Sequence, residues 1–336
     1  MKDLIVITKK YGFYTGATVA TQHYVDNWSK YFDRIYVFTL ENEGVNEYKN
    51  ITVIECSNSK KLLKDVLKLK QSTNKVIGYS DDHLGYLFKT VGIPYIHTYH
   101  GNWPDARYVS SDMFFKSFYF IHYYKKTISY AAITVDVSYY MHQKFTKKYA
   151  KHSVVIRNGT NQISSIKSSN KINPRILMIG NIDKRKYKIA KKIFKLIKNS
   201  ELSKSFTIDI YGEIFDKKLS NELSSYNFVN IKGKVSKIDI SDYNILLSLS
   251  AMENLPISIV EAAQAKIPII STNVGGVSEV VHDSLNGYIL DSNNYNEIIR
   301  LIHKAIKMDV LNDMALSEEF NWEKSSLKYI KAFDSI

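Results

Sequence analysis

Short apolar runs rich in β-branched residues alternate along this chain with longer segments whose apolar positions recur at helical spacing. In the first half the pattern predicts strands at residues 4–8, 34–40, 51–55, 75–80, 94–100, 131–135 and 153–157, and helices at 18–30, 59–71, 112–130 and 138–150. Such alternation is typical of a parallel sheet whose helices cross back over its faces.

The same alternation restarts after residues 158–174, a polar segment rich in Ser and Asn that reads as a linker. Strands are then predicted at 175–179, 206–211, 228–232, 243–249, 267–272 and 287–290, and helices at 187–199, 216–225, 256–265 and 294–307. A chain of 336 residues exceeds the usual size of one hydrophobic core. We therefore predict an α/β protein of two Rossmann-like, doubly wound parallel-sheet domains that face each other across a ligand-binding cleft.

The net charge of +13 is unevenly distributed. Residues 1–170 hold 23 Lys and Arg against 13 Asp and Glu, whereas residues 171–336 hold 23 against 20. An excess of +10 in the first half favours an anionic partner. Only six of the 46 basic residues are arginine, the side chain that reads guanine edges, so sequence-specific binding of nucleic acid is disfavoured. A membrane surface, a pyrophosphate-bearing acceptor, or a lysine-rich composition without any partner remain as alternatives.

The sequence also bears on where the protein is found. Its first ten residues contain only a short apolar run closed by two lysines, too brief for a signal-peptide core. No stretch reaches the roughly 18 apolar residues that a spanning helix needs. The single cysteine, Cys56, cannot form an internal disulfide, which fits a reducing compartment. We expect a cytoplasmic protein, with peripheral attachment to the cytoplasmic face of the membrane left open.

The densest chemical signal runs from Ser250 to Glu279, where a predicted strand ends, a polar loop follows and a helix begins at Pro256. Proline suits the first helical position because it lacks an N–H group. The free backbone N–H groups of this helix start favour an anion, and Glu253 and Glu261 can both face it. Carboxylates accept hydrogen bonds from vicinal hydroxyls, so the pair suits a sugar nucleotide. Either glutamate alone could equally be a surface residue.

Glu253 and Glu261 are separated by seven residues, and the string IPIISTNVGGVSE follows from Ile267. This pattern resembles the retaining glycosyltransferases of family 4, the glycosyl transferases group 1, which have the GT-B fold. Further similar motifs lie at 155–159, 175–186, 286–290 and 320–322, so the resemblance spans most of the chain. It implies an acceptor-side domain at 1–160, a nucleotide-sugar-binding domain at 171–320, and a terminal helix at 321–336 that returns to the first domain.

The resemblance also assigns roles. Glu261 binds the ribose hydroxyls, Glu253 contacts the donor hexose, and Lys186 neutralises the diphosphate, where charge gathers in the transition state. The family's arginine position holds Asn181, which removes one cation from the expected clamp. Arg185 can compensate, although adjacent residues at a helix start are expected to point in different directions, and a solvated basic run is the alternative. The implied donor site comprises Gly16, Arg185, Lys186, Glu253, Asn254, Leu255, Pro256 and Glu261, and the implied catalytic residues are His100, Glu253 and Lys186.

Two of these residues come from the first half. Gly16 lies in a loop between a predicted strand and helix, where family members place a Gly-rich loop beside the diphosphate, although a lone glycine there is more often just a turn. His100 stands at the end of a predicted strand, where the family commonly has a histidine near the donor sugar. No Asp-x-Asp element is present, so no metal or other cofactor is expected. Asp81-Asp82-His83 reads as a helix cap.

Residues 113–126 contain seven aromatic side chains beside lysines. A basic helix with aromatic residues can lie in a bilayer interface. Aromatic residues on nearly every face also suit a helix buried against a sheet. Membrane contact is therefore a hypothesis that rests on the positive charge of this half of the chain.

Taken together, the sequence predicts a metal-independent, retaining glycosyltransferase. It would move a hexosyl group from a nucleotide diphosphate sugar to a hydroxyl of a glycan or polyprenyl-linked glycan, in the synthesis of a bacterial surface polysaccharide such as lipopolysaccharide or capsule. Two alternatives stay open. A sugar-nucleotide epimerase of similar architecture would act on the donor without an acceptor, and a non-catalytic protein that binds polyanions or membranes would explain the charge alone.

Overall fold

The computed structural model describes residues 2–12, 15–44, 47–73, 75–160, 173–235, 237–291, 294–310 and 319–336. The chain forms two compact units. The first comprises Met1–Arg107, Asp112–Gly159 and Glu319–Ile336, and the second comprises Tyr108–Ser111 and Thr160–Glu318. Most of the predicted linker, residues 161–172, lies outside the described residues.

The first unit is built on an eight-stranded sheet. Its spatial order is β10 (Ser153–Val155), β9 (Ile133–Asp136), β8 (Tyr95–Tyr99), β7 (Val76–Ser80), β1 (Asp3–Ile7), β3 (Ile35–Thr39), β6 (Ile51–Glu55) and β5 (Glu47–Tyr48). All neighbouring strands are parallel except β5 and β6. A small separate sheet pairs β2 (Lys10–Gly12) with β4 (Glu41–Glu43). The predicted parallel sheet is confirmed.

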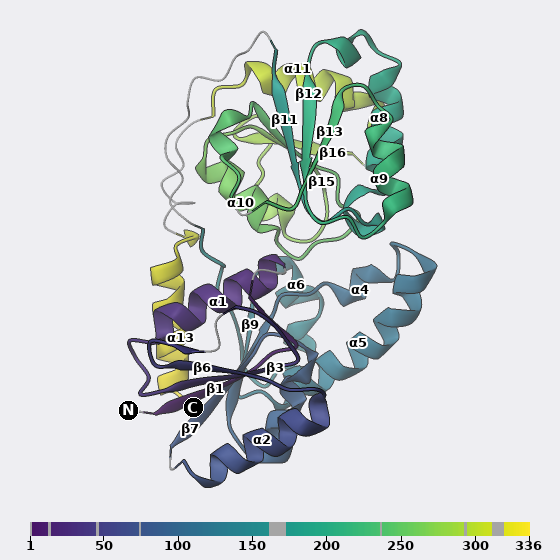
Figure 1. Cartoon of the computed structure of the whole chain (residues 1–336). Coiled ribbons are helices and arrows are strands. Elements are labelled where there is room, and N and C mark those ends of the chain that lie inside the picture. Colours follow the sequence, from purple (N-terminus) through teal and green to yellow (C-terminus); the bar gives the residue numbers. More distant parts are fainter. Residues whose placement is uncertain are drawn as a thin grey trace. The chain divides into compact units, whose positions relative to one another are not determined.

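Helices cover both faces of this sheet (Figure 1). Apolar residues of α2 (Ser59–Gln71) and α3 (Leu87–Val91) pack with strand residues such as Ile5 and Ile7 in one buried cluster. On the other face, α1 (Gly16–Trp28) lies beside α13 (Trp322–Asp334). The Trp28 ring lies 5.2 Å from that of Tyr329, whose hydroxyl is 2.8 Å from the Thr98 hydroxyl of β8. The last helix of the chain is thus part of the first unit's core.

One helix prediction in this unit is wrong. The expected helix at 138–150 is divided into α6 (Tyr139–Lys144) and a 3-10 turn at Thr146–Lys148. Phe145 adopts a non-helical backbone conformation between them. Phe145 and Thr146 are both buried, and the Thr146 hydroxyl donates to the buried Asp136 carboxylate, so tertiary contacts interrupt the helix. The remaining helices are α4 (Trp103–Ala106) and α5 (Ser111–Tyr130), together with a 3-10 turn at His83–Tyr86.

The second unit has a six-stranded parallel sheet in the order β13 (Val229–Gly233), β12 (Thr207–Tyr211), β11 (Arg175–Ile179), β14 (Ile245–Ser248), β15 (Ile269–Thr272) and β16 (Gly287–Leu290). Its helices are α7 (Lys184–Tyr187), α8 (Ala190–Lys198), α9 (Lys217–Ser224), α10 (Ile257–Gln264) and α11 (Ile298–Lys307). Short 3-10 turns lie at Glu201–Lys204, Ile240–Asp242, Val277–Glu279 and Tyr295–Glu297. The predicted helix at 187–199 begins at Ala190, after the separate short helix α7.

The main core of this unit lies on the face of the sheet that α8, α9 and α11 cover. Ile208 and Ile210 of β12 point into that core. Because side chains alternate along a strand, Asp209 points to the opposite face.

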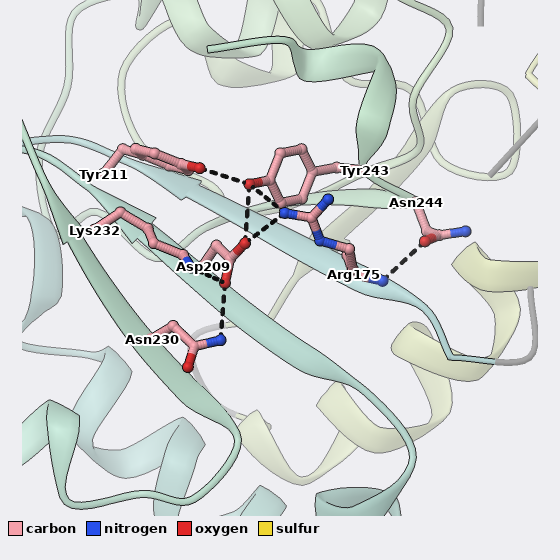
Figure 2. Close-up of polar contacts among 7 residues, drawn as sticks. All are labelled: Arg175, Asp209, Tyr211, Asn230, Lys232, Tyr243 and Asn244. Carbon is pink, nitrogen blue, oxygen red and sulfur yellow. Dashed lines mark hydrogen bonds and ion pairs between the residues drawn. The ribbon is translucent and has the colours of Figure 1, made fainter. Parts of the chain in front are cut away.

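A polar network surrounds Asp209 on that face (Figure 2). The Asp209 carboxylate is only 2% exposed and accepts hydrogen bonds from Arg175 at 2.8 Å, Asn230 at 2.9 Å and the Tyr243 hydroxyl at 3.0 Å. Burial would raise the pKa of Asp209, but these hydrogen bonds and the Lys232 ammonium, 3.8 Å away, hold it below its ordinary value. The network ties β11, β12 and β13 together.

Asp209→Asn should lower the free energy of unfolding by about 2 kcal/mol at pH 7, because charged hydrogen bonds are the stronger ones. The depressed pKa means that the stabilisation is present above the unfolded-state pKa and is lost as the pH falls through the folded-state value. Denaturant unfolding should therefore show that the free energies of unfolding of the wild type and Asp209→Asn differ less at pH 3 than at pH 7. Lys232→Gln, which alters an exposed partner, should cost less than about 0.5 kcal/mol. An equal loss of unfolding free energy in Asp209→Asn and Lys232→Gln would contradict the view that the buried Asp209 carboxylate is the stabilising centre of the network.

Candidate active site

The loop between β14 and α10 is held by backbone contacts at the carboxyl edge of the second sheet. The Thr272 hydroxyl at the end of β15 donates to the Ser250 carbonyl at 2.6 Å, and the Gly276 N–H donates to the Asn254 carbonyl at 2.6 Å. Asn254 and Leu255 are buried. The loop that contains Gly275 and Gly276 therefore supports the segment that carries Glu253.

Gly275 shows why a glycine is needed in that support. Its φ angle is +60°, in the left-handed region. A Cβ atom there would lie 2.1 Å from the Glu253 carbonyl oxygen and 2.5 Å from that of Asn254. Only a residue without a side chain can approach this loop so closely.

Pro256 is one position away from where the sequence predicted it. It occupies the N-cap of α10 in an extended conformation, and Ile257 is the first helical residue. A proline side chain cannot accept a hydrogen bond, and no side chain caps this helix. The Ile259 N–H already donates to the Pro256 carbonyl at 3.1 Å, so of the first-turn N–H groups only those of Ile257 and Ser258 have no acceptor among the described residues.

Glu253 is the centre of an ion cluster. Its Oε1 atom lies 2.6 Å from the Lys186 Nζ atom and 3.0 Å from an Arg185 guanidinium nitrogen. The Glu253 and Lys186 side chains are 11% and 12% exposed, so the charges are largely removed from water. The expectation that Arg185 and Lys186 point in different directions is wrong, because both cations reach the same carboxylate oxygen.

The two cations come from α7, which local contacts hold in place. Asp183 caps α7, its carboxylate accepting the Lys186 N–H at 2.9 Å. The Arg185 carbonyl accepts the Ala251 N–H at 2.8 Å, which ties α7 to the Glu253 loop. The Lys186 stem packs on Gly180, where a Cβ atom would lie 2.8 Å from the lysine Cε. Side-chain direction is thus set by contacts with the neighbouring loop.

Asn181 stands where the family pattern has an arginine, and its side chain has another partner. Its Oδ1 atom accepts the Glu213 backbone N–H at 3.2 Å. This bond joins the loop after β11 to the loop after β12. Arg185, by contrast, is directed at Glu253.

Glu253 and Glu261 have opposite electrostatic environments. Burial alone would raise the pKa of Glu253, but the charges of Lys186 and Arg185 bring it below its ordinary value. Burial raises the pKa of Glu261, which is half-buried on α10. Among the described residues, none forms a hydrogen bond or ion pair with the Glu261 carboxylate. The Glu261 carboxylate is thus an acceptor that no described residue engages.

The other two candidates belong to the first unit. Gly16 is the first residue of α1, which Thr15 caps by accepting the Thr18 N–H, while Phe13 and Tyr14 of the preceding loop lie outside the described residues. His100 directly follows β8, one residue after the strand ends. Its Nε2 atom is buried without a partner in the described part of the chain, and burial lowers the pKa of His100 to about 4.

Asp81 and Asp82 follow β7, which lies between β1 and β8 in the sheet. The prediction of a helix cap is confirmed for Asp82, whose carboxylate accepts the Leu84 N–H at 2.7 Å. Asp81 accepts the Thr21 hydroxyl at 2.6 Å, and burial, followed by the charge of Asp82, raises the pKa of Asp81 to about 7. No local pattern predicts this environment, since the burial of Asp81 arises from tertiary packing and its partner Thr21 comes from α1.

None of the helices in the described residues is long and apolar enough to cross a bilayer. No group of three or more His, Cys, Asp or Glu side chains in the described ranges could hold a metal ion.

Solved structures with a similar fold show the class of protein to which this fold belongs. The fold is similar to that of Anabaena HepE, solved with UDP and glucose, with a TM-score of 0.77 and 16% identity over 99% of both chains. It is also similar to WaaG, a glycosyltransferase involved in lipopolysaccharide biosynthesis, with a TM-score of 0.69 and 14% identity over 98% of this chain and 95% of that one. Two Rossmann-like units in this arrangement of strands and helices are the GT-B fold.

The sequence comparisons give the family. Residues 160–320 match the family described as glycosyl transferases group 1. An uncharacterized glycosyltransferase of Methanocaldococcus jannaschii is 23% identical over 328 residues, which cover 90% of each chain. The resemblance noted in the sequence is confirmed: this chain is a glycosyltransferase of the GT-B fold that carries a group 1 domain.

Gly275→Ala should displace the Glu253 loop, because the new methyl group would meet two carbonyl oxygens. Gly233→Ala is the matched control, since Gly233 also has a positive φ of +74° but nothing within 4 Å of its Cβ position. The control should lose about 1 kcal/mol of stability from backbone strain alone. Gly275→Ala should lose clearly more in denaturant unfolding. Equal losses would show that the close approach to Glu253 is unimportant.

Proposed function

We propose that the enzyme is a metal-independent, retaining glycosyltransferase that transfers a hexosyl group from a nucleotide diphosphate sugar to a hydroxyl of a glycan or lipid-linked glycan. The observation that carries the proposal is the convergence of Arg185 and Lys186 on one buried carboxylate oxygen in the group 1 domain. Two cations that meet at one point suit a diphosphate.

In this proposal the cations stabilise the leaving group. A departing nucleoside diphosphate gathers negative charge, and fixed cations in a poorly solvated site lower the cost of that charge. Lys186 takes the role that the family resemblance gives it. Arg185 supplies the second cation in place of the arginine that Asn181 replaces, because its guanidinium reaches the same oxygen as Lys186.

The carboxylates recognise hydroxyls. Glu261, which has no internal partner in the described residues, accepts hydrogen bonds from the ribose. Glu253 contacts the hexose, and Asn254, Leu255 and Pro256 form the loop around it. In the first unit, we assign Gly16 to the diphosphate and the neutral ring of His100 to the sugar, on the family resemblance.

The proposed reaction takes place on one face of the sugar. The bond between the anomeric carbon and the diphosphate oxygen breaks, and a bond to the acceptor oxygen forms on the same face. The acceptor proton passes to the leaving phosphate oxygen. This route retains the anomeric configuration without a protein nucleophile.

We infer a role in the synthesis of a bacterial surface polysaccharide. The structural likeness to WaaG, whose description names lipopolysaccharide biosynthesis, supports this inference. The net charge of +10 in residues 1–170 also suits an acceptor that carries a pyrophosphate.

A nucleotide-sugar panel tests the proposed function. UDP sugars come first because the similar HepE structure contains UDP, and GDP sugars follow. We expect thermal stabilisation by one donor class, transfer that persists with EDTA, and a product of unchanged anomeric configuration by NMR. Incubation of the enzyme with the donor and no acceptor tests the first alternative, because an isomerised sugar would indicate an epimerase. No thermal stabilisation by any nucleotide sugar would instead indicate a non-catalytic binding protein.

Glu261→Gln should weaken binding of the preferred donor about tenfold, because a charged acceptor for the ribose hydroxyls is lost. Because the pKa of Glu261 is raised, its carboxylate is protonated at a higher pH than that of an ordinary glutamate. As the pH is lowered, donor affinity of the wild type should therefore begin to fall at that higher pH. Glu261→Gln should lack this acid limb in calorimetric titrations. Glu201→Gln, at an exposed position in the same unit, is the control. Unchanged affinity in Glu261→Gln would remove Glu261 from the site.

We further propose that the first unit contacts an anionic membrane through α5. Four aromatic side chains in its first half are exposed, namely Phe114, Phe115, Phe118 and Tyr119. Phe115 and Phe118 are 71% and 61% exposed, more than burial against a sheet would allow. Lysines on the same helix add attraction to anionic lipid.

The double variant Phe115→Ser/Phe118→Ser should lower the fraction of protein that floats with anionic liposomes severalfold, because it removes the aromatic groups that would insert. Phe215→Ser changes an aromatic residue that is 63% exposed in the other unit and should leave flotation unchanged. Wild-type binding should weaken at high salt. Flotation that is absent, or equal in all three proteins, would refute the membrane proposal.

A further inference from the structure

The ion cluster of the second unit gives Glu253 two roles that compete with each other. Its Oε1 atom is paired with both Lys186 and Arg185. In the proposed function, the two cations bind the donor diphosphate and Glu253 binds sugar hydroxyls. The diphosphate and the Glu253 Oε1 atom would therefore compete for the same two cations, and an Oε1 atom that holds them is less able to accept from the sugar.

We propose that Glu253 is an internal competitor of the diphosphate, which holds Arg185 and Lys186 in the empty site and gives them up when the donor binds. This inference rests on the proposed function and adds a coupling between the two halves of the donor. The diphosphate takes the cations, and the Oε1 atom of Glu253 is thereby released to accept hydrogen bonds from the hexose.

The burial of the cluster explains why a substitute partner is needed. Lys186 is 12% exposed, and an unpaired ammonium at that burial is costly. Glu253 supplies the counter-charge and keeps both side chains ordered before the donor arrives. Little side-chain entropy is then lost on binding.

The exchange also has a consequence after transfer. Once the sugar has left, the product diphosphate alone holds the cations, and the hexose no longer occupies Glu253. Recapture of Lys186 and Arg185 by Glu253 then favours release of the product. Glu253 therefore weakens diphosphate binding while it promotes turnover of the intact donor.

Calorimetric titration with inorganic pyrophosphate tests the competition without assuming a base or a sugar. Glu253→Gln keeps the shape of the side chain but removes its charge, so it should bind pyrophosphate about tenfold more tightly than the wild type. The same variant should transfer sugar more slowly. If Glu253 had only a structural role, its replacement would lower both pyrophosphate affinity and the transfer rate. A rise in affinity together with a fall in rate therefore identifies Glu253 as the competitor.

Glu201→Gln makes the same charge change at an exposed site and should leave pyrophosphate affinity unchanged. If Glu253→Gln lowers stability, its melting temperature should still rise more with pyrophosphate than that of the wild type.

Unchanged or weaker pyrophosphate binding by Glu253→Gln would overturn the competition. Lys186→Met and Arg185→Met separate this failure from that of the proposed function. If these two variants bind pyrophosphate weakly, the cations still form the diphosphate site and only the competition is wrong. If they bind it as the wild type does, the diphosphate site itself is wrongly placed.

Discussion

Parallel strands cannot be joined by a tight turn, so each connection must cross back over a face of the sheet. This constraint places the loops that follow the strands at one edge in each unit. Strands β11 and β14 are neighbours, and the loops after them bring Arg185 and Lys186 to Glu253, although 68 residues of sequence separate Arg185 from Glu253. The chemistry of the second unit depends on this adjacency.

Burial then gives the two glutamates of the motif, Glu253 and Glu261, different properties. Glu253 remains charged because two cations compensate for the water it has lost, and its pKa is depressed. Glu261 lacks such a partner among the described residues, and its pKa is raised by burial. Two glutamates on one short segment are therefore suited to different contacts, which is a property of their surroundings rather than of their spacing.

The first unit shows a similar division between scaffold and surface. Aromatic side chains of α1 and α13, including Trp28, Tyr329 and Phe333, pack together on one face of its sheet. The aromatic residues in the first half of α5 are instead exposed. Composition alone could not separate these groups, because both segments are rich in aromatic residues and only packing decides which of them are covered.

The sequence by itself determined the order of the parallel strands in the two main sheets, since each carries its own apolar pattern, and strand limits such as 51–55 and 175–179 agree with β6 and β11. It also located the segment from Glu253 to Gly276 through its motif and so gave the family. It did not predict the short strands β2, β4 and β5 or the short helices α3 and α4. Only the tertiary structure decided where side chains point. The convergence of Arg185 and Lys186, the interruption at Phe145 and the raised pKa of Asp81 arise from contacts between segments far apart in the chain, and a local pattern holds no information about those contacts.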